Sequence, residues 1–169
     1  MKTTNVGLAE YKISSKPDEA LVILGLGSSI GLFFFDPRTQ VAAAVHVMLP
    51  AGRDEDAHPT KYCSSAVPFL LAQMEAAGAS TEELKVAVFG GATMLSTGPT
   101  SLLEIGQRNT AAAADALAKA GLTPVVSDTG GSKGRNVALE VATGYVTVKV
   151  LAQPDRVYAD LTLGPEVGQ

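Results

Sequence analysis

The sequence contains few of the residues that build disulfides and metal centres. Its 169 residues include one cysteine, Cys63, two histidines, His46 and His58, and no tryptophan. A single cysteine excludes an internal disulfide, and the cysteine and histidines do not cluster at the spacing of a metal site. We therefore expect the chain to work without a metal ion or another cofactor.

Charge and long apolar runs are also scarce. Charged residues make up 18% of the chain, the formal net charge is −4, and no basic stripe is present, which argues against binding to nucleic acid or to an anionic membrane. No apolar run approaches the roughly 18 residues that span a bilayer, and no basic segment precedes an apolar stretch as in a signal peptide. These absences predict a cytoplasmic protein that is not inserted in a membrane and whose macromolecular partners are proteins.

Enough apolar residues remain for one sizeable core. Hydrophobic residues account for 46% of the sequence, and a chain of this length suits one domain better than two. We expect a single domain over residues 1–169 with its core at about 7–163, a boundary at Gln153-Pro154, and short flexible ends at residues 1–6 and after Leu163.

Apolar periodicity and turn residues divide the chain into strands and helices. Short apolar, β-rich runs bounded by Gly, Pro or Asp predict strands at 21–24, 30–35, 41–49, 85–89, 124–127, 137–141 and 145–151. Helical spacing predicts two main helices at 60–76 and 101–119, the second ended by Gly121. Because several strand pairs have hairpin connections, the expected fold class is α/β: a layered sandwich with mixed or antiparallel strands and two main helices packed on one side.

The chemistry concentrates in residues 20–50. Ser29 follows a glycine-serine turn at the start of the second strand, and His46 lies on the third strand. Asp36-Pro37-Arg38-Thr39 carries turn residues between these strands, so a hairpin there would return His46 towards Ser29. A hydroxyl and an imidazole in contact form a possible nucleophile and base. The backbone amides of residues 25–29 are candidate donors for an oxyanion hole.

Other polar or glycine-rich positions have structural explanations. Cys63 lies at a predicted helix start, where a lone cysteine is usually a small buried apolar residue, and His58 lies in a polar loop. Gly90-Gly91 and Gly130-Gly131 lack the spacing of a phosphate-binding loop and indicate tight turns or close backbone approach. The loop that leads to Arg135 has two interpretations: a polar loop in which Arg135 pairs with a nearby carboxylate, or a loop near the active site that positions substrate or docks a partner.

An ordered series of motifs extends over most of the chain. Its members are Gly25-Leu26-Gly27-Ser28, Asp36-Pro37, His46-Val47-Met48-Leu49-Pro50, Lys61-Tyr62, Phe89-Gly90-Gly91-Ala92-x-Met94, Ile105-Gly106-x-Arg108-Asn109, Asp128-Thr129-Gly130-Gly131, Gly134-Arg135 and Thr143-Gly144. Over residues 7–150 this series closely resembles the CheD family of chemoreceptor glutamine deamidases. The hallmarks of that family are a Gly-Leu-Gly-Ser-Cys turn, a hydrophobic strand that ends in Asp-Pro, and a His-x-Met-Leu-Pro strand end. Each motif is weak by itself, but their order and spacing make the resemblance specific.

The resemblance implies a reaction and the residues that perform it. In the family, a cysteine thiolate attacks a glutamine side-chain amide, ammonia leaves, and hydrolysis of the thioester gives glutamate. The resemblance places Ser29 in the position of that cysteine and makes His46 the general base. It places Ile23 where the family usually has a threonine.

The resemblance also implies contacts and partners. Gly27, Ser28 and Thr129 are expected to contact the substrate or the oxyanion. The implied partners are the cytoplasmic helices of chemoreceptors and a CheC-type phosphatase, and the implied fold is a similar layered sandwich.

The serine at position 29 and the isoleucine at position 23 leave the activity undecided. A hydroxyl depends more on an adjacent base and on oxyanion donors than a thiol does, whose pKa is about 8.5, so we expect the chain to be slow or inactive. Three explanations stand: an engineered Cys→Ser substitution that traps an inactive state, a natural serine variant with slow hydrolysis, or a degenerate relative that only binds. Two further functions compete with deamidation: a binding module that docks to receptors or to the phosphatase, and a serine amidohydrolase of other small amides.

Overall fold

A computed structural model describes residues 1–150 and 156–163 of the chain. Within these residues the strands are β1 (Lys2–Asn5), β2 (Tyr11–Ser14), β3 (Glu19–Leu26), β4 (Ile30–Asp36), β5 (Val41–Val47), β6 (Lys85–Gly90), β7 (Val126–Thr129), β8 (Arg135–Glu140), β9 (Tyr145–Val150) and β10 (Arg156–Asp160). The helices are α1 (Cys63–Ala76), α2 (Thr100–Leu103) and α3 (Ile105–Lys119), and a 3₁₀ turn, η1, covers Pro59–Lys61. The composition is the α/β mixture that the sequence predicts.

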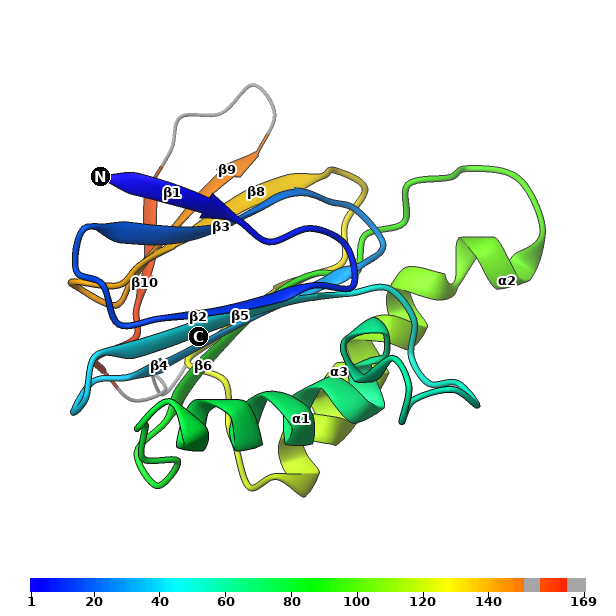
Figure 1. Ribbon diagram of the computed structural model, residues 1–169. Coiled ribbons are helices and arrows are strands. Elements are labelled where there is room, and N and C mark those ends of the chain that lie inside the picture. The colour runs from blue at the N-terminus through cyan, green and yellow to red at the C-terminus, as the bar shows by residue number, and fades with distance from the viewer. Residues whose placement is uncertain (151–155, 164–169) are drawn as a thin grey trace.

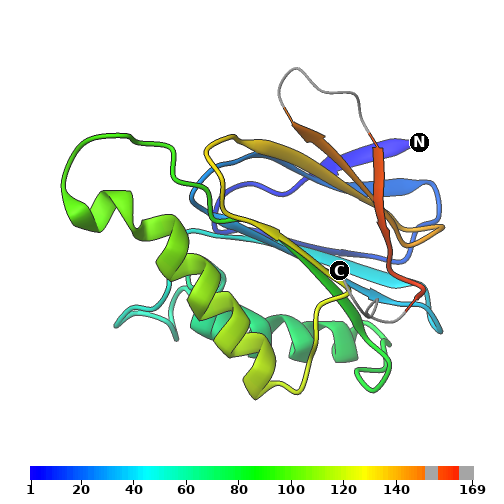
Figure 2. The ribbon, with the colours of Figure 1, turned by 180° about the vertical axis from the view of Figure 1, so that it is seen from behind.

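The strands form two sheets that lie face to face. One sheet has the order β1-β3-β8-β9-β10 and the other the order β2-β5-β4-β6-β7. Helices α1 and α3 pack together against the outer face of the second sheet (Figure 1 and Figure 2). The layers are therefore sheet, sheet and helices, which confirms the predicted layered sandwich with its main helices on one side.

The central strand β4 is apolar on both faces because both faces are covered. Leu32 and Phe34 pack with the helices, whereas Phe33 and Phe35 pack in the layer between the sheets. All four side chains are at most 1% exposed, and the Phe33 ring meets Phe89 of β6 edge to face with 5.8 Å between centroids. A continuous apolar run, in place of alternation, is typical of a strand buried on both sides.

The hairpin that carries both catalytic candidates joins β4 to β5. The strands pair antiparallel, with Gly31 opposite His46. At the turn, the Asp36 carboxylate accepts hydrogen bonds from the Arg38 N–H at 3.0 Å and from the Thr39 hydroxyl at 2.6 Å. The predicted return of the third strand is confirmed, and its register decides which residues meet at the far end of the hairpin.

The first residues are paired, in contrast to the flexible end expected for residues 1–6. Strand β1 runs parallel to β3, with Lys2 opposite Glu19, and Val6 is 2% exposed. Strand β2, which also has no counterpart in the sequence-based expectation, pairs antiparallel with β5. Both strands have four residues, too few to show apolar periodicity, and backbone hydrogen bonds to longer neighbours hold them.

The two main helices differ from the expected ranges near their starts. The 3₁₀ turn η1 and an extended residue, Tyr62, precede α1, so the helix expected at 60–76 begins at Cys63. The helix expected at 101–119 is divided at Glu104 into α2 and α3. Helical periodicity locates the apolar face well but does not register such local changes of backbone angle.

The strand boundaries also differ from the expected ones, by about two residues. Strand β5 ends at Val47, two residues before the expected end at residue 49, and β7 lies two residues beyond the expected 124–127. The expected hairpin at Gly144 joins β8 to β9 and is confirmed. The expected boundary at Gln153-Pro154 and the tail after Leu163 lie outside the described residues.

Candidate active site

Ser29 ends a short loop that carries the chain from β3 in one sheet to β4 in the other. The end of β3 is irregular, because its pairing with β8 shifts between Ile23 and Leu26. Within this bulge Gly25 has a φ of +69°, a conformation that glycine adopts without strain, and its N–H donates to Asn136 Oδ1 at 2.9 Å. The bulge turns the chain and leaves Ser29 directly before β4.

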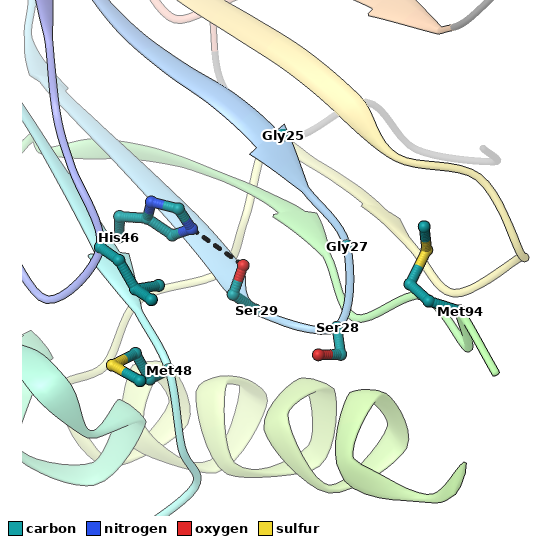
Figure 3. Close-up of a pocket in the computed structure, with 8 residues that line it drawn as sticks. Gly25, Gly27, Ser28, Ser29, His46, Met48 and Met94 are labelled. Carbon is teal, nitrogen blue, oxygen red and sulfur yellow. Dashed lines mark hydrogen bonds between the residues drawn. The ribbon is translucent and has the colours of Figure 1, made fainter. Parts of the chain in front are cut away.

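His46 faces the same layer as Ser29. Its cross-strand partner is Gly31, and directly paired residues project from the same face of a sheet. Ser29 lies two residues before Gly31, so its side chain faces that layer as well. The two side chains meet, with Ser29 Oγ 2.8 Å from His46 Nε2 (Figure 3). The structure thus brings together the two residues that the sequence analysis paired.

His46 is suited to act as a neutral base. The residue is 6% exposed, and burial lowers the pKa of its imidazole because the charged ring would lose hydration. The backbone carbonyl of Val6 acts on the ring as a weak acceptor and partly opposes this shift. No described atom completes a well-formed hydrogen bond to the buried Nδ1. At neutral pH the ring is uncharged, and its Nε2 can accept the Ser29 proton.

Ile23 packs close to Gly31, the strand partner of His46. Its side chain is fully buried in the layer between the sheets, and its Cδ1 is 3.1 Å from the position that a Cβ on Gly31 would take. Gly31 is the strand partner of His46. At this position a threonine would offer a hydroxyl, whereas isoleucine offers no hydrogen-bonding atom.

A cavity of about 370 Å³ opens beside the Ser29 and His46 pair. Backbone of the β3–β4 loop, the reacting pair and apolar side chains line it: Leu8, Gly25, Gly27, Ser28, Ser29, His46, Met48 and Met94. Position 27 has little room for a side chain larger than that of glycine, because a Cβ there would lie 3.1 Å from Met94 Cγ. The apolar walls suit methylene groups, and the polar end suits an amide or an ester.

Two of the three expected contact residues line this cavity. Gly27 and Ser28 do so, although the Ser28 side chain points away from His46 (Figure 3). Thr129 ends β7, where it pairs with Gly90, and it does not border the cavity. Contact between Thr129 and a substrate stays a prediction without a geometric argument.

The end of β6 fixes the loop that carries Ser29. The Gly91 N–H donates to the Ser29 carbonyl and the Ala92 N–H to the Gly27 carbonyl, both at 2.9 Å. Gly90, with a φ of +111°, passes so close that a Cβ would lie 2.1 Å from the Ser29 carbonyl oxygen. Only glycine fits there, which confirms the interpretation of Gly90-Gly91 as a close backbone approach.

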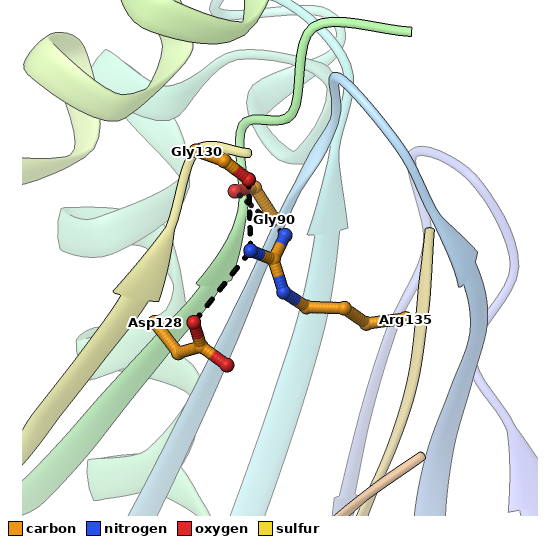
Figure 4. A network of polar contacts seen from close by, with 4 residues as sticks. All are labelled: Gly90, Asp128, Gly130 and Arg135. Atoms are coloured by element: carbon orange, nitrogen blue, oxygen red, sulfur yellow. Dashed lines mark hydrogen bonds and ion pairs between the residues drawn. The ribbon is translucent and has the colours of Figure 1, made fainter. Parts of the chain in front are cut away.

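Arg135 supports the same strand end from β8 (Figure 4). Its guanidinium donates to the carbonyls of Gly90 at 3.3 Å and Gly130 at 2.8 Å, and it lies 3.6 Å from the Asp128 carboxylate. The expected pairing of Arg135 with a carboxylate is confirmed. The loop also lies next to the strand end that holds Ser29, while a role in docking a partner stays a prediction.

Asn109 is a site residue that the sequence analysis named only as part of a motif. It lies on α3, is fully buried, and its Nδ2 donates to the Ser28 carbonyl at 2.9 Å and to the Met48 carbonyl at 3.0 Å. One feature of the sequence could have revealed it. Asn109 lies at helical spacing from the buried Ala113 and Ala116, so it belongs to the apolar face, where a polar side chain needs partners.

The remaining candidates are structural. Cys63 is buried, and burial raises the pKa of its thiol to about 12, so it is not a nucleophile, as expected. His58 is exposed.

In residues 1–150 and 156–163 no group of His, Cys, Asp and Glu could hold a metal ion. None of the helices in this described part is long and apolar enough to cross a membrane.

Comparison with known proteins gives consistent results. The family model described as CheD chemotactic sensory transduction matches residues 48–150. A protein of Symbiobacterium thermophilum named "Probable chemoreceptor glutamine deamidase CheD" is 41% identical over 152 residues, which cover 88% of this chain and 92% of the relative. "Probable chemoreceptor glutamine deamidase CheD 2" of Geobacter metallireducens is 36% identical over 90% of this chain and 96% of its own length.

A further relative and a solved structure complete the comparison. "Probable chemoreceptor glutamine deamidase CheD" of Haloarcula marismortui is 40% identical over 85% of this chain and 83% of its own length. The crystal structure of the Bacillus licheniformis hypothetical protein YfiH aligns with a TM-score of 0.40 and 12% identity over 70% of this chain and 49% of that chain, a likeness too weak to carry an argument. The family model matches more than half of the chain, and the three relatives align with 85% or more of it, so the chain belongs to the CheD family.

Proposed function

We propose that this chain is built to act on glutamine side chains of chemoreceptors, where it would convert the amide to a carboxylate and release ammonia. The observation that carries the proposal is the 2.8 Å contact between Ser29 Oγ and His46 Nε2 at the wall of a cavity. The substrate comes from the relatives, each named as a probable chemoreceptor glutamine deamidase.

The first step is attack on the amide. A glutamine side chain in the cavity would lay its methylene groups against Leu8, Met48 and Met94. His46 Nε2 accepts the Oγ proton while Ser29 Oγ bonds to the carbonyl carbon, and the carbonyl oxygen takes up negative charge. The Ser29 backbone N–H donates to no described residue, so it is available to bind that oxygen.

The second step releases ammonia and restores the protein. The His46 imidazolium gives its proton to the amide nitrogen, the C–N bond breaks, ammonia leaves, and an ester of Ser29 remains. Water, deprotonated by His46, attacks this ester. The C–O bond to Ser29 then breaks, Oγ regains a proton, and the former glutamine is a glutamate.

Serine at position 29 limits the rate of this reaction. A thiol titrates near 8.5, so part of it is ionised at neutral pH, whereas a hydroxyl must lose its proton during the attack itself. His46 is the group that takes the proton, and no described atom completes a well-formed hydrogen bond to its Nδ1 that would stabilise the imidazolium. We therefore expect deamidation by the unsubstituted chain to be slow or absent.

A second candidate function is binding without turnover. Ser29 in the nucleophile position and the buried Ile23, where the family usually has threonine, favour this function. The first lacks the thiol and the second lacks the hydroxyl, while the cavity persists. In this function the protein would act in the cytoplasm by docking to chemoreceptor helices or to a CheC-type phosphatase.

Deamidation of a purified chemoreceptor cytoplasmic fragment separates these functions. The readouts are ammonia release and the small increase in fragment mass when an amide becomes a carboxylate. We compare the unsubstituted chain with the Ser29→Cys variant and with the variant that combines Ser29→Cys and Ile23→Thr. We expect Ser29→Cys to restore activity and Ile23→Thr to increase it further by about 10-fold, the lower end of what a supporting hydrogen bond contributes.

Two control proteins make the result interpretable. Ser29→Ala removes the nucleophile, and Ser29→Cys with His46→Ala removes the base, so neither is expected to release ammonia. Binding of the fragment is measured for every protein by sedimentation or calorimetry. Binding without any ammonia release, even with cysteine and threonine restored, would establish the docking function and contradict deamidation.

A further inference from the structure

Asn109 donates to two carbonyls that flank the reacting pair. The Ser28 carbonyl comes directly before Ser29, and the Met48 carbonyl belongs to the second residue after His46. Both facing atoms are acceptors, so only the NH₂ group of the side chain can point towards them. Its two N–H groups are thereby used, and the buried Oδ1 has no described hydrogen-bond partner.

This contact sets the direction of the Ser29 N–H. The described residues contain no cis peptide bond, and in a trans peptide the C=O and the following N–H point to opposite sides. The Ser28 C=O points to Asn109 on α3. The Ser29 N–H therefore points away from α3, towards the side of the loop where Ser29 Oγ meets His46 (Figure 3), and it donates to no described residue.

Asn109 also donates the middle one of three hydrogen bonds to successive carbonyls of the loop. The Gly27 and Ser29 carbonyls accept hydrogen bonds from backbone N–H groups of the segment after β6. The Ser28 carbonyl between them accepts from the Asn109 side chain. The outer two contacts are made by backbone, so the middle one is the contact that a substitution can remove without changing the loop itself.

We propose that Asn109 is the positioning residue of an oxyanion hole whose donor is the Ser29 N–H. The assignment rests on the proposed function, in which the group at position 29 attacks a carbonyl carbon. Without the Asn109 amide no hydrogen bond holds the Ser28 carbonyl, so the peptide between residues 28 and 29 can tilt and the Ser29 N–H is no longer aimed at the negative oxygen. Removal of the Asn109 amide should therefore slow reactions at position 29 that form an oxyanion. It should leave the rate of other reactions at that position nearly unchanged.

Two reagents distinguish these classes of reaction in the Ser29→Cys protein. With p-nitrophenyl acetate, the introduced thiolate at position 29 bonds to the acetyl carbonyl carbon, an oxyanion forms, and the C–O bond breaks to release p-nitrophenolate. With iodoacetamide, the sulfur bonds to the methylene carbon and iodide leaves without any oxyanion. Cys63 is silent in both reactions, because its buried thiol has its pKa raised to about 12.

Asn109→Leu in the Ser29→Cys protein is the main variant. We expect acylation to fall about 10- to 100-fold, somewhat less than the loss of a whole oxyanion donor, and alkylation to change less than about threefold with the same pH midpoint. Asn109→Asp keeps the size of the side chain and removes the paired NH₂ donors, so it serves if the leucine variant does not fold. Arg108→Gln, at an exposed neighbouring position of α3, is the matched control.

Parallel losses of acylation and alkylation would show a merely structural role and overturn the assignment, as would unchanged acylation. Deamidation of a receptor fragment, measured alongside, separates this inference from the proposed function. If the Ser29→Cys protein deamidates nothing but its ratio of acylation to alkylation falls with Asn109→Leu, the function fails and the oxyanion hole stands. If it deamidates the fragment and the ratio does not move, the function stands and the assignment to Asn109 fails.

Discussion

At the scale of residues, the reacting pair has a good contact but little support. Ser29 Oγ and His46 Nε2 are 2.8 Å apart, which is close enough for proton transfer. The second ring nitrogen is buried without a well-formed hydrogen bond, and in Ser–His sites a partner at that nitrogen orients the ring and stabilises the imidazolium. Reactivity is therefore limited at two atoms, the nucleophilic oxygen and Nδ1.

The pH dependence of acylation follows from the burial of His46. Only the neutral imidazole can accept the Ser29 proton, and burial lowers the pKa of that ring. We predict that acetylation of Ser29 by p-nitrophenyl acetate rises with pH to a plateau, with a midpoint below the ordinary histidine value of about 6.5. Mass spectrometry measures the rate at each pH. His46→Ala should abolish the pH dependence, and a midpoint at or above 6.5 would contradict a buried, neutral base.

The sequence predicts this pair but not the residue that holds its loop. Ser29 and His46 lie on adjacent apolar runs joined by recognisable turn residues, so local patterns bring them together. Asn109 acts on backbone carbonyls that are 81 and 61 residues away in the chain. Any residue has a carbonyl, so no side-chain pattern marks these acceptors, and only the packing of α3 on the sheet brings them to Asn109.

At the scale of elements, burial on both faces makes a strand easy to recognise in the sequence. Strands β4 and β5 are buried along their whole length, and their apolar runs are unmistakable. Strands β1 and β2 lie next to β3 and β5 in their sheets and are mostly exposed or half-buried. Their stability comes from backbone pairing, which carries no side-chain signature.

Gly90 at the end of β6 connects this backbone packing to the nucleophile. An alanine there would meet the Ser29 carbonyl oxygen at 2.1 Å and adopt a φ of +111°. We predict that Gly90→Ala lowers the free energy of unfolding by about 3 kcal/mol or more, from strain and displacement of the loop together. Urea unfolding measures the stability, and the acetylation rate of Ser29 measures the displacement.

Gly121 provides the matched control for Gly90. It has a φ of +74° after α3, and a Cβ there meets nothing within 4 Å. Gly121→Ala should therefore cost only the backbone strain, about 1 kcal/mol, and leave acetylation unchanged. Equal effects of the two substitutions would mean that the contact between Gly90 and the loop does not hold Ser29 in place.

At the scale of the whole molecule, Glu19 ties the two sheets together. Its carboxylate, on β3, accepts hydrogen bonds from the Thr4 hydroxyl of β1 and, at 2.6 Å, from the Ser14 hydroxyl of β2. Strands β1 and β3 belong to one sheet and β2 to the other. The hydrogen bond from Ser14, followed by that from Thr4, lowers the pKa of Glu19 below its ordinary value, because both favour the charged form.

The lowered pKa of Glu19 predicts a loss of stability in acid. In the unfolded chain the Glu19 carboxylate takes up its proton at about pH 4.5, whereas in the folded chain it does so only at lower pH. Its contribution to the free energy of unfolding is therefore complete above about pH 4.5 and is lost as the pH falls through the folded-state pKa. The lowered pKa of His46 acts in the same direction below about pH 6.5. We predict that Glu19→Gln lowers the free energy of unfolding at pH 7 by about 1–2 kcal/mol, and that this difference shrinks below about pH 4.5.

Urea unfolding of both proteins between neutral and acid pH tests the role of Glu19. The His46 contribution is common to both, so it cancels in the difference and leaves only the part that depends on position 19. Glu140→Gln is the control, because Glu140 lies on β8 of the same sheet and its side chain makes no hydrogen bond to a described residue. If the two substitutions change the acid profile equally, general charge and not the link between the sheets sets the acid stability. If only Glu19→Gln flattens the profile, the carboxylate that joins the sheets is the group whose protonation loosens the sandwich.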